Sequence, residues 1–320
     1  MFARAVLPAL LLTAAGVVGA GPAAATPEAP DLSGYSAVAP DQYVDGGEAY
    51  FQTPDGLLCG IRPAQGMAGC DGPLPRGSSG ANQVVLSADQ VRRGLHNTAS
   101  PLFVKSTGAA AAVLPVGHKI VLDDFACAVG DAKVFCTKGN PVAQWLAIVP
   151  DGTSVGPPTP GLPAGFPDPN DFVVDDESYI VGTGAKNLFP VFTVGSGLTC
   201  KMAMFSGGVI GCDTTPPAVL PGVDGSDDEV FAQLPGPVGT RRAGTPRLAN
   251  PDYPGVVKEL PIGHRIDSYG ATCMATDDGV ACFGAAGGAP PGFQVSGSET
   301  RTFGGLRDAW QSSAVSETPV

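Results

Sequence analysis

Residues 114–120 read LPVGHKI, and residues 260–266 read LPIGHRI. The eight cysteines show the same duplication. Their successive spacings are 11, 57 and 9 residues in the first half and 12, 61 and 9 in the second, at positions 59, 70, 127, 136, 200, 212, 273 and 282. A pattern that recurs in order over this length predicts two tandem repeat units.

The cysteine spacing also predicts a set of disulfide bonds. Four cysteines per unit allow three pairings, and the short spacings favour the local ones: Cys59–Cys70, Cys127–Cys136, Cys200–Cys212 and Cys273–Cys282. Each pair flanks a turn-forming stretch, and a hairpin that turns there places its cysteines opposite each other, about 5.5 Å apart. The chain has neither a Cys-x-x-Cys motif nor a Cys/His cluster, so no metal site is expected.

Composition predicts a fold without long helices. The chain has 45 Gly and 32 Pro in 320 residues, and these residues cost about 1 and 3 kcal/mol inside a helix. Hydrophobic residues make up 43% of the chain, which is enough to form a core. Short apolar runs between turn residues predict a mainly all-β protein of two tandem β-barrel or sandwich-like repeats, each stabilised by its own disulfide bonds. Capping boxes at 87–90 and 226–229 predict one short helix in each unit.

The chain divides into six segments on composition. They are a signal peptide at 1–25, a flexible Pro/Ala-rich leader at 26–49, the first repeat unit at 50–155, a Pro/Gly-rich and acidic linker at 156–188, the second unit at 189–303 and a C-terminal tail at 304–320. Arg4, the apolar stretch after it and the small residues at 23–25 are typical of a cleaved secretory signal. No later stretch reaches the roughly 20 apolar residues of a membrane span. The mature protein is therefore expected to be secreted or to lie in the cell envelope.

The net charge excludes one class of partner. It is −12 for the whole chain and −13 once Arg4 is removed with the signal, so nucleic acid would be repelled. The acidic runs at 168–177 and 224–229 are expected to be solvated loops. The chain has no phosphate loop and no dinucleotide fingerprint, so no cofactor is expected.

Two histidines are the candidate site residues. His118 and His264 occupy the same place in the two heptapeptides, where each could bind a ligand or act as a base. The alternative is that each ring caps its turn through a backbone hydrogen bond. A Gly-x-Ser-x-Gly match at 152–156 is not a nucleophile elbow, because Pro157 prevents the helix that must follow the serine. No catalytic residue is assigned.

The motif FQTPDGLLCGI at 51–61 carries a family resemblance, together with the later Gly-Cys-Asp, the Leu-Pro-x-Gly turn and the closing pair of cysteines in each unit. These residues resemble exported domains of mycobacteria and related actinobacteria that have no assigned function. The sequence departs from that pattern at Leu57, where Asn is common, and at 194–197, where the turn lacks proline. The resemblance implies placement in the envelope, and because the family has no assigned activity it assigns no catalytic residue to this chain.

Three functions remain open. The favoured one is a non-enzymatic exported binding or envelope-associated protein of unknown ligand, with a cell-wall component or another exported protein as partner. The second is a secreted hydrolase-type enzyme with a site at the interface of the two repeats, which would use His118 or His264 with a nearby aspartate. The third is a structural component of the wall.

Overall fold

Short β-strands make up nearly all of the regular structure. The computed structural model describes residues 28–75, 80–89, 91–175, 179–181, 189–203, 209–214, 218–223, 225–234, 236–243, 257–284 and 290–304. Within these residues the regular elements are strands and three 3-10 turns, which confirms the predicted all-β class. No helix in this part of the chain is long and apolar enough to cross a membrane.

The first unit contains thirteen strands in two sheets. They are β1 (Ser36–Ala37), β2 (Val44–Asp45), β3 (Glu48–Gln52), β4 (Leu58–Arg62), β5 (Met67–Asp71), β6 (Gln83–Ser87), β7 (Gly94–His96), β8 (Ala112–Val113), β9 (His118–Leu122), β10 (Phe125–Gly130), β11 (Lys133–Lys138), β12 (Gln144–Val149) and β13 (Gly152–Gly156). One sheet has the order β1-β9-β10-β11-β12-β13. The other runs from β2 to β7 in chain order, with β8 beside β3.

The second unit also contains thirteen strands among the described residues. Its strands are β14 (Val173–Val174), β15 (Ile180–Val181), β16 (Phe189–Val194), β17 (Leu198–Ala203), β18 (Val209–Thr214), β19 (Glu229–Gln233), β20 (Val238–Arg241), β21 (Lys258–Glu259), β22 (His264–Ser268), β23 (Ala271–Thr276), β24 (Gly279–Gly284), β25 (Gly292–Val295) and β26 (Thr300–Phe303). β15 to β20 form one sheet, with β21 beside β16, and β14 and β22 to β26 lie in the other.

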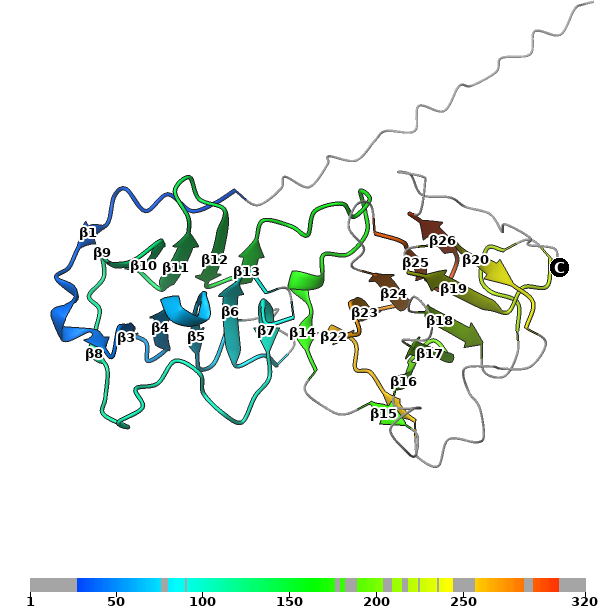
Figure 1. Ribbon diagram of the computed structural model, residues 1–320, viewed down its shortest axis with the longest axis horizontal. Coiled ribbons are helices and arrows are strands. Elements are labelled where there is room, and N and C mark those ends of the chain that lie inside the picture. Colours follow the sequence, from blue (N-terminus) through cyan, green and yellow to red (C-terminus); the bar gives the residue numbers. More distant parts are fainter. Residues whose placement is uncertain are drawn as a thin grey trace, which may run out of the picture.

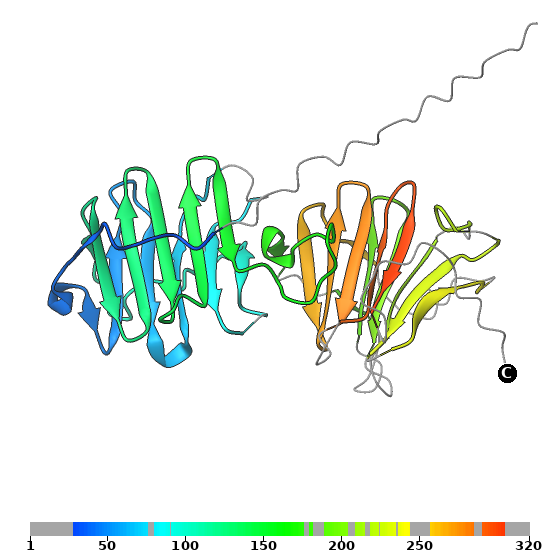
Figure 2. The same cartoon turned by 90° about the horizontal axis from the view of Figure 1, so that it is seen from above.

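One strand joins the two units into a continuous sheet. β14 lies parallel to β7 of the first unit on one side and parallel to β22 on the other, and Val173 is opposite both Leu95 and His264. The result is a thirteen-stranded sheet that runs through both units. The two units therefore lie end to end along the longest axis of the molecule, with β14 between them (Figures 1 and 2).

In each unit two sheets pack face to face around an apolar core that contains two disulfides. The structure joins Cys59 to Cys70, Cys127 to Cys136, Cys200 to Cys212 and Cys273 to Cys282, the four local pairs that the spacing predicts. Each pair occupies directly opposed positions of an antiparallel hairpin, with Cα atoms 4.0–4.1 Å apart. All eight cysteines are fully buried, so the bonds cross-link the inner faces of the hairpins.

The leader and the linker both contribute strands, which corrects the expectation that they are flexible connections. Segment 26–49 supplies β1, β2, the 3-10 turn η1 (Pro40–Gln42) and the start of β3, and segment 156–188 supplies η3 (Pro169–Asp171), β14 and β15. Backbone bonds hold both two-residue strands: Ser36 N donates to Gly117 O at 2.9 Å, and Val173 N to Gly263 O at 2.9 Å. Strands this short have no alternation of apolar residues to detect.

The two expected helices are absent from the described residues, which corrects that prediction. The serine hydroxyl that would cap the first helix, on Ser87, instead accepts from Asp89 N at 3.1 Å, in a turn that follows β6. Glu229, expected inside the second helix, begins β19 and pairs with Asp213 and Arg241. A serine can cap a turn as well as a helix, and sheet pairing here overrides the local preference. The third 3-10 turn, η2, spans Pro63–Gln65.

The signal peptide at 1–25 lies outside the described residues, as do residues 305–320 of the predicted tail. Both assignments stay predictions.

Candidate functional site

A cleft of about 590 Å³ lies where the second unit meets the first. Its walls come from four places: the loop after β7, the end of β14, the segment before β15, and the turn between β21 and β22. The lining residues are Asn97, Thr98, Ala99, Val174, Asp175, Tyr179, Glu259, Pro261 and His264. The volume is within the range of small-molecule sites.

The LPIGHRI turn places His264 in this cleft. Gly263 has a φ of +79°, a left-handed conformation that favours glycine. His264 N donates to Pro261 O at 3.0 Å, and Gly263 N donates to Ala275 O at 2.9 Å. The backbone therefore fixes the imidazole at the first residue of β22.

His264, Asp175 and Tyr179 form a hydrogen-bonded chain in the cleft. The His264 Nδ1 atom lies 3.2 Å from Asp175 Oδ2, and the Tyr179 hydroxyl donates to the same oxygen at 2.9 Å. The side chains of His264 and Asp175 are only 16% and 9% exposed. Asp175 accepts this hydrogen bond when His264 carries its proton on Nδ1. In that neutral tautomer Nε2 has no proton and can accept a hydrogen bond. A second carboxylate, on Glu259, lines the same cleft.

His118 lies in a different environment, although its turn matches that of His264. Its Nδ1 atom contacts Val116 O of its own turn at 3.1 Å. Val38 takes the place beside β9 that Asp175 takes beside β22, since Val38 N donates to Lys119 O as Asp175 N donates to Arg265 O. The structure therefore brings one of the two predicted histidines into the cleft and leaves the other capping a turn.

Two buried arginines fix the junction beside the cleft. Arg265 donates through Nη2 to Arg93 O at 2.5 Å, through Nη1 to Pro169 O, and through Nε to Asp267 at 2.9 Å. Arg93 donates in turn to Pro157 O. Both arginines are 2% exposed, and burial lowers the pKa of Arg93. Arg265 thus holds together the first unit, the linker and the second unit.

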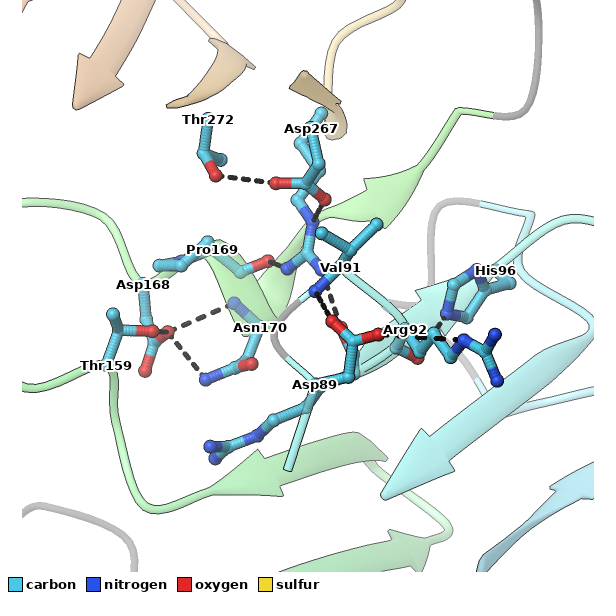
Figure 3. Close-up of polar contacts among 12 residues, drawn as sticks. Asp89, Val91, Arg92, His96, Thr159, Asp168, Pro169, Asn170, Asp267 and Thr272 are labelled. Atoms are coloured by element: carbon cyan, nitrogen blue, oxygen red, sulfur yellow. Dashed lines mark hydrogen bonds and ion pairs between the residues drawn. The ribbon is translucent and has the colours of Figure 1, made fainter. Parts of the chain in front are cut away.

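The turn that precedes β14 is held by an aspartate from the acidic run. Asp168 Oδ1 accepts from Asn170 N at 3.0 Å, from Asn170 Nδ2 at 2.9 Å and from Thr159 at 3.3 Å, and Figure 3 shows these contacts. Asp267, on the other side of the junction in the same view, also accepts from Thr272 at 2.5 Å. Asp168 and Asp175 have structural partners, which corrects the expectation that the run 168–177 is only a solvated loop.

Sequence reasoning missed Asp175, Tyr179 and Glu259. Asp175 and Tyr179 lie in the segment 156–188, which was expected to be a linker. Glu259 directly precedes the heptapeptide at 260–266. The sequence did contain a pattern that aligns the linker with the leader: Asp-x-Asn at 168–170 matches Asp-x-Ser at 31–33. In both, the carboxylate accepts from the backbone two residues on, at 2.8 Å for Ser33 and 3.0 Å for Asn170.

The cleft can recognise hydrogen-bond donors. It presents two carboxylates, an amide and two hydroxyls, and none of the described residues lining it is Lys or Arg. Among the residues that the structure describes, no three His, Cys, Asp or Glu side chains are grouped so as to hold a metal ion. No protein-family model, curated protein or solved structure matches this chain.

Proposed function

We propose that this chain is an exported protein that binds a cell-wall component in the cleft at its unit junction. The observation that carries the proposal is the Tyr179–Asp175–His264 chain, which lines a cleft of about 590 Å³. Its ligand carries hydroxyl or amino groups, because carboxylate oxygens accept hydrogen bonds and disfavour an anionic ligand. Four buried disulfides support an oxidising location outside the cytoplasm.

The proposal includes duplication and membership in the exported actinobacterial family. Duplication is supported by the matching strand orders and by β1, which pairs with β9 through His118 as β14 pairs with β22 through His264. Family membership is supported by the 51–61 motif. This segment contains a turn in which Gly56 N donates to Thr53 O at 3.0 Å, and it ends in a disulfide-bonded strand.

Retention on an insoluble actinobacterial cell-wall fraction tests the proposal. We expect the mature chain to sediment with the fraction and His264→Ala to lower its affinity about tenfold or more, since a hydrogen bond to a charged group contributes about 1.5–3 kcal/mol. His118→Ala is the matched control, because that ring contacts only its own turn among the contacts described above. Equal retention of the two variants, or no retention of the unaltered chain, contradicts the proposal.

A hydrolase-type enzyme is the second candidate, and a specific contact favours it. Asp175 orients the His264 ring through Nδ1, which is how a carboxylate positions a general base. In this mechanism water is the nucleophile and His264 Nε2 receives its proton; the described lining contains no Ser or Cys. Time-dependent release of soluble fragments from the wall fraction, lost in Asp175→Asn, would identify this activity. Saturable retention without release identifies the binding protein.

A further inference from the structure

We infer that copies of this chain associate end to end, with β1 of one copy pairing along β20 of the next. The junction inside the chain is the template for this contact. There, β14 lies between β22 of its own unit and β7, the last of the strands β2 to β7 that the first unit contributes to the shared sheet. The partner is therefore a second copy of this chain, and the inference does not depend on the proposed ligand.

β1 has the geometry of β14 but lacks its outer neighbour. Ser36 and Ala37 are opposite His118 and Lys119, as Val173 and Val174 are opposite His264 and Arg265. Within the described residues, no strand pairs with the other edge of β1. Both residues of β1 are exposed, whereas both residues of β14 are buried. The missing outer strand accounts for this difference.

The outward edge of β1 offers a backbone donor. Ser36 N and Val38 N donate to Gly117 O and Lys119 O at 2.9 and 3.0 Å. Because successive N–H groups of a strand point to opposite sides, the N–H of Ala37 points away from β9. The same alternation in β14 directs the N–H of Val174 toward β7.

The segment that leads into β1 is held by a side-chain hydrogen bond like the one that holds the segment before β14. Lys119 Nζ donates to Leu32 O at 2.8 Å, as Arg265 donates to Pro169 O. Val113 and Val116, which are 51% and 50% exposed, add apolar surface at this end of the molecule. An unpaired strand edge beside exposed apolar side chains is a template for pairing with another chain.

β20 is the counterpart of β7 at the other end. Thr240 is opposite Val230, which is opposite Cys212, and Leu95 is opposite Val84, which is opposite Cys70. The junction register therefore predicts that Ser36 of one copy lies opposite Thr240 of the next. β20 has β19 as its single strand neighbour among the described residues.

The position of the two edges makes the association open-ended. β1 and β20 lie at opposite ends of the longest axis (Figure 1). A contact between two different surfaces is heterologous and adds copies in a row unless the rotation closes a ring. Because β1 spans two residues, we expect a weak association that depends on concentration.

Sedimentation velocity of the mature chain at physiological salt tests the inference, over a series from about 10 μM to 1 mM, the range of weak interfaces. We expect the mean sedimentation coefficient to rise continuously with concentration. Ala37→Pro removes the outward N–H and should weaken association at least about tenfold, while proline at a solvent-facing edge position leaves the strand intact. Ala37→Ser keeps the N–H and is the matched control.

Mixing distinguishes this contact from other modes of association. Ala37→Pro keeps its β20 edge, so it should cap growing rows and reduce the size of wild-type assemblies in a mixture. If Ala37→Pro does not fold, as judged by circular dichroism, Ala37→Lys supplies the readout, because it places a charge where the junction buries Val174. A wild-type chain that stays monomeric throughout the series overturns the inference. So does an Ala37→Pro or Ala37→Lys variant that associates like wild type.

Discussion

Replacing Arg265 should destabilise the junction more than any exposed charge substitution. The guanidinium is 2% exposed and contacts Pro169 O, Arg93 O and Asp267. Arg265→Ala removes one partner of a buried ion pair and leaves the others desolvated, which costs about 3–5 kcal/mol. At about 2–4 °C per kcal/mol for a chain of this size class, the Tm should fall by about 6–20 °C.

Two further variants grade the effect in the same thermal melt, followed by circular dichroism. Arg265→Lys should lose less, because an ammonium can reach one carbonyl, as Lys119 reaches Leu32 O at 2.8 Å. Arg92→Ala is the control, since its ion pair with Asp89 is exposed and contributes at most about 1 kcal/mol. A melting temperature of Arg265→Ala within about 2 °C of wild type would refute the reasoning.

Three further predictions concern stability. Burial, together with the hydrogen bond to Glu48, raises the pKa of Tyr50 to about 12. Its stabilising contribution should therefore be present below about pH 10 and lost toward pH 12, and urea unfolding of Tyr50→Phe across this range should lack that loss. Gly156→Ala would place a Cβ 2.1 Å from the Trp145 ring, which should cost about 1–3 kcal/mol in denaturant unfolding, whereas Gly34→Ala meets no atom within 4 Å and should cost little. Replacing the Cys127–Cys136 pair by serines should cost about 2.5–3 kcal/mol, and non-reducing mass spectrometry of the native chain should find no free thiol.

The fold class and the cysteine pairs were predictable because both depend on local pattern. A hairpin with a short turn places two nearby cysteines opposite each other wherever it folds, so spacing alone was sufficient. The strands of the leader and linker were not predictable, because Ser36–Ala37 and Val173–Val174 are stabilised by parallel partners that lie 78 to 91 residues away in the chain (118 − 36 = 82, 173 − 95 = 78 and 264 − 173 = 91). A Pro- and Gly-rich composition indicates the turns around such strands but gives no sign of the strands themselves.

The candidate site was half predictable. The repeated heptapeptide identified His264, but only tertiary structure separates it from His118. One difference lies beside the ring: Asp175 is next to β22 where Val38 is next to β9. Glu259 shows the same asymmetry, since Val113 takes its place in the pairing of β8 with β3. Neither difference between the units can be recognised in the sequence without the strand pairing that aligns 175 with 38 and 259 with 113.

The position of β14 determines how the chain would respond to a protease. A single cut between Pro157 and Pro163 leaves β14 paired with β7 on one side and with β22 on the other. The two fragments should therefore stay associated in native buffer and separate only in denaturant. A second unit expressed alone would have to begin before Asp168 to retain both β14 and the turn in front of it, which the Asp168 side chain holds. The first unit expressed alone would expose the edge of β7 to solvent.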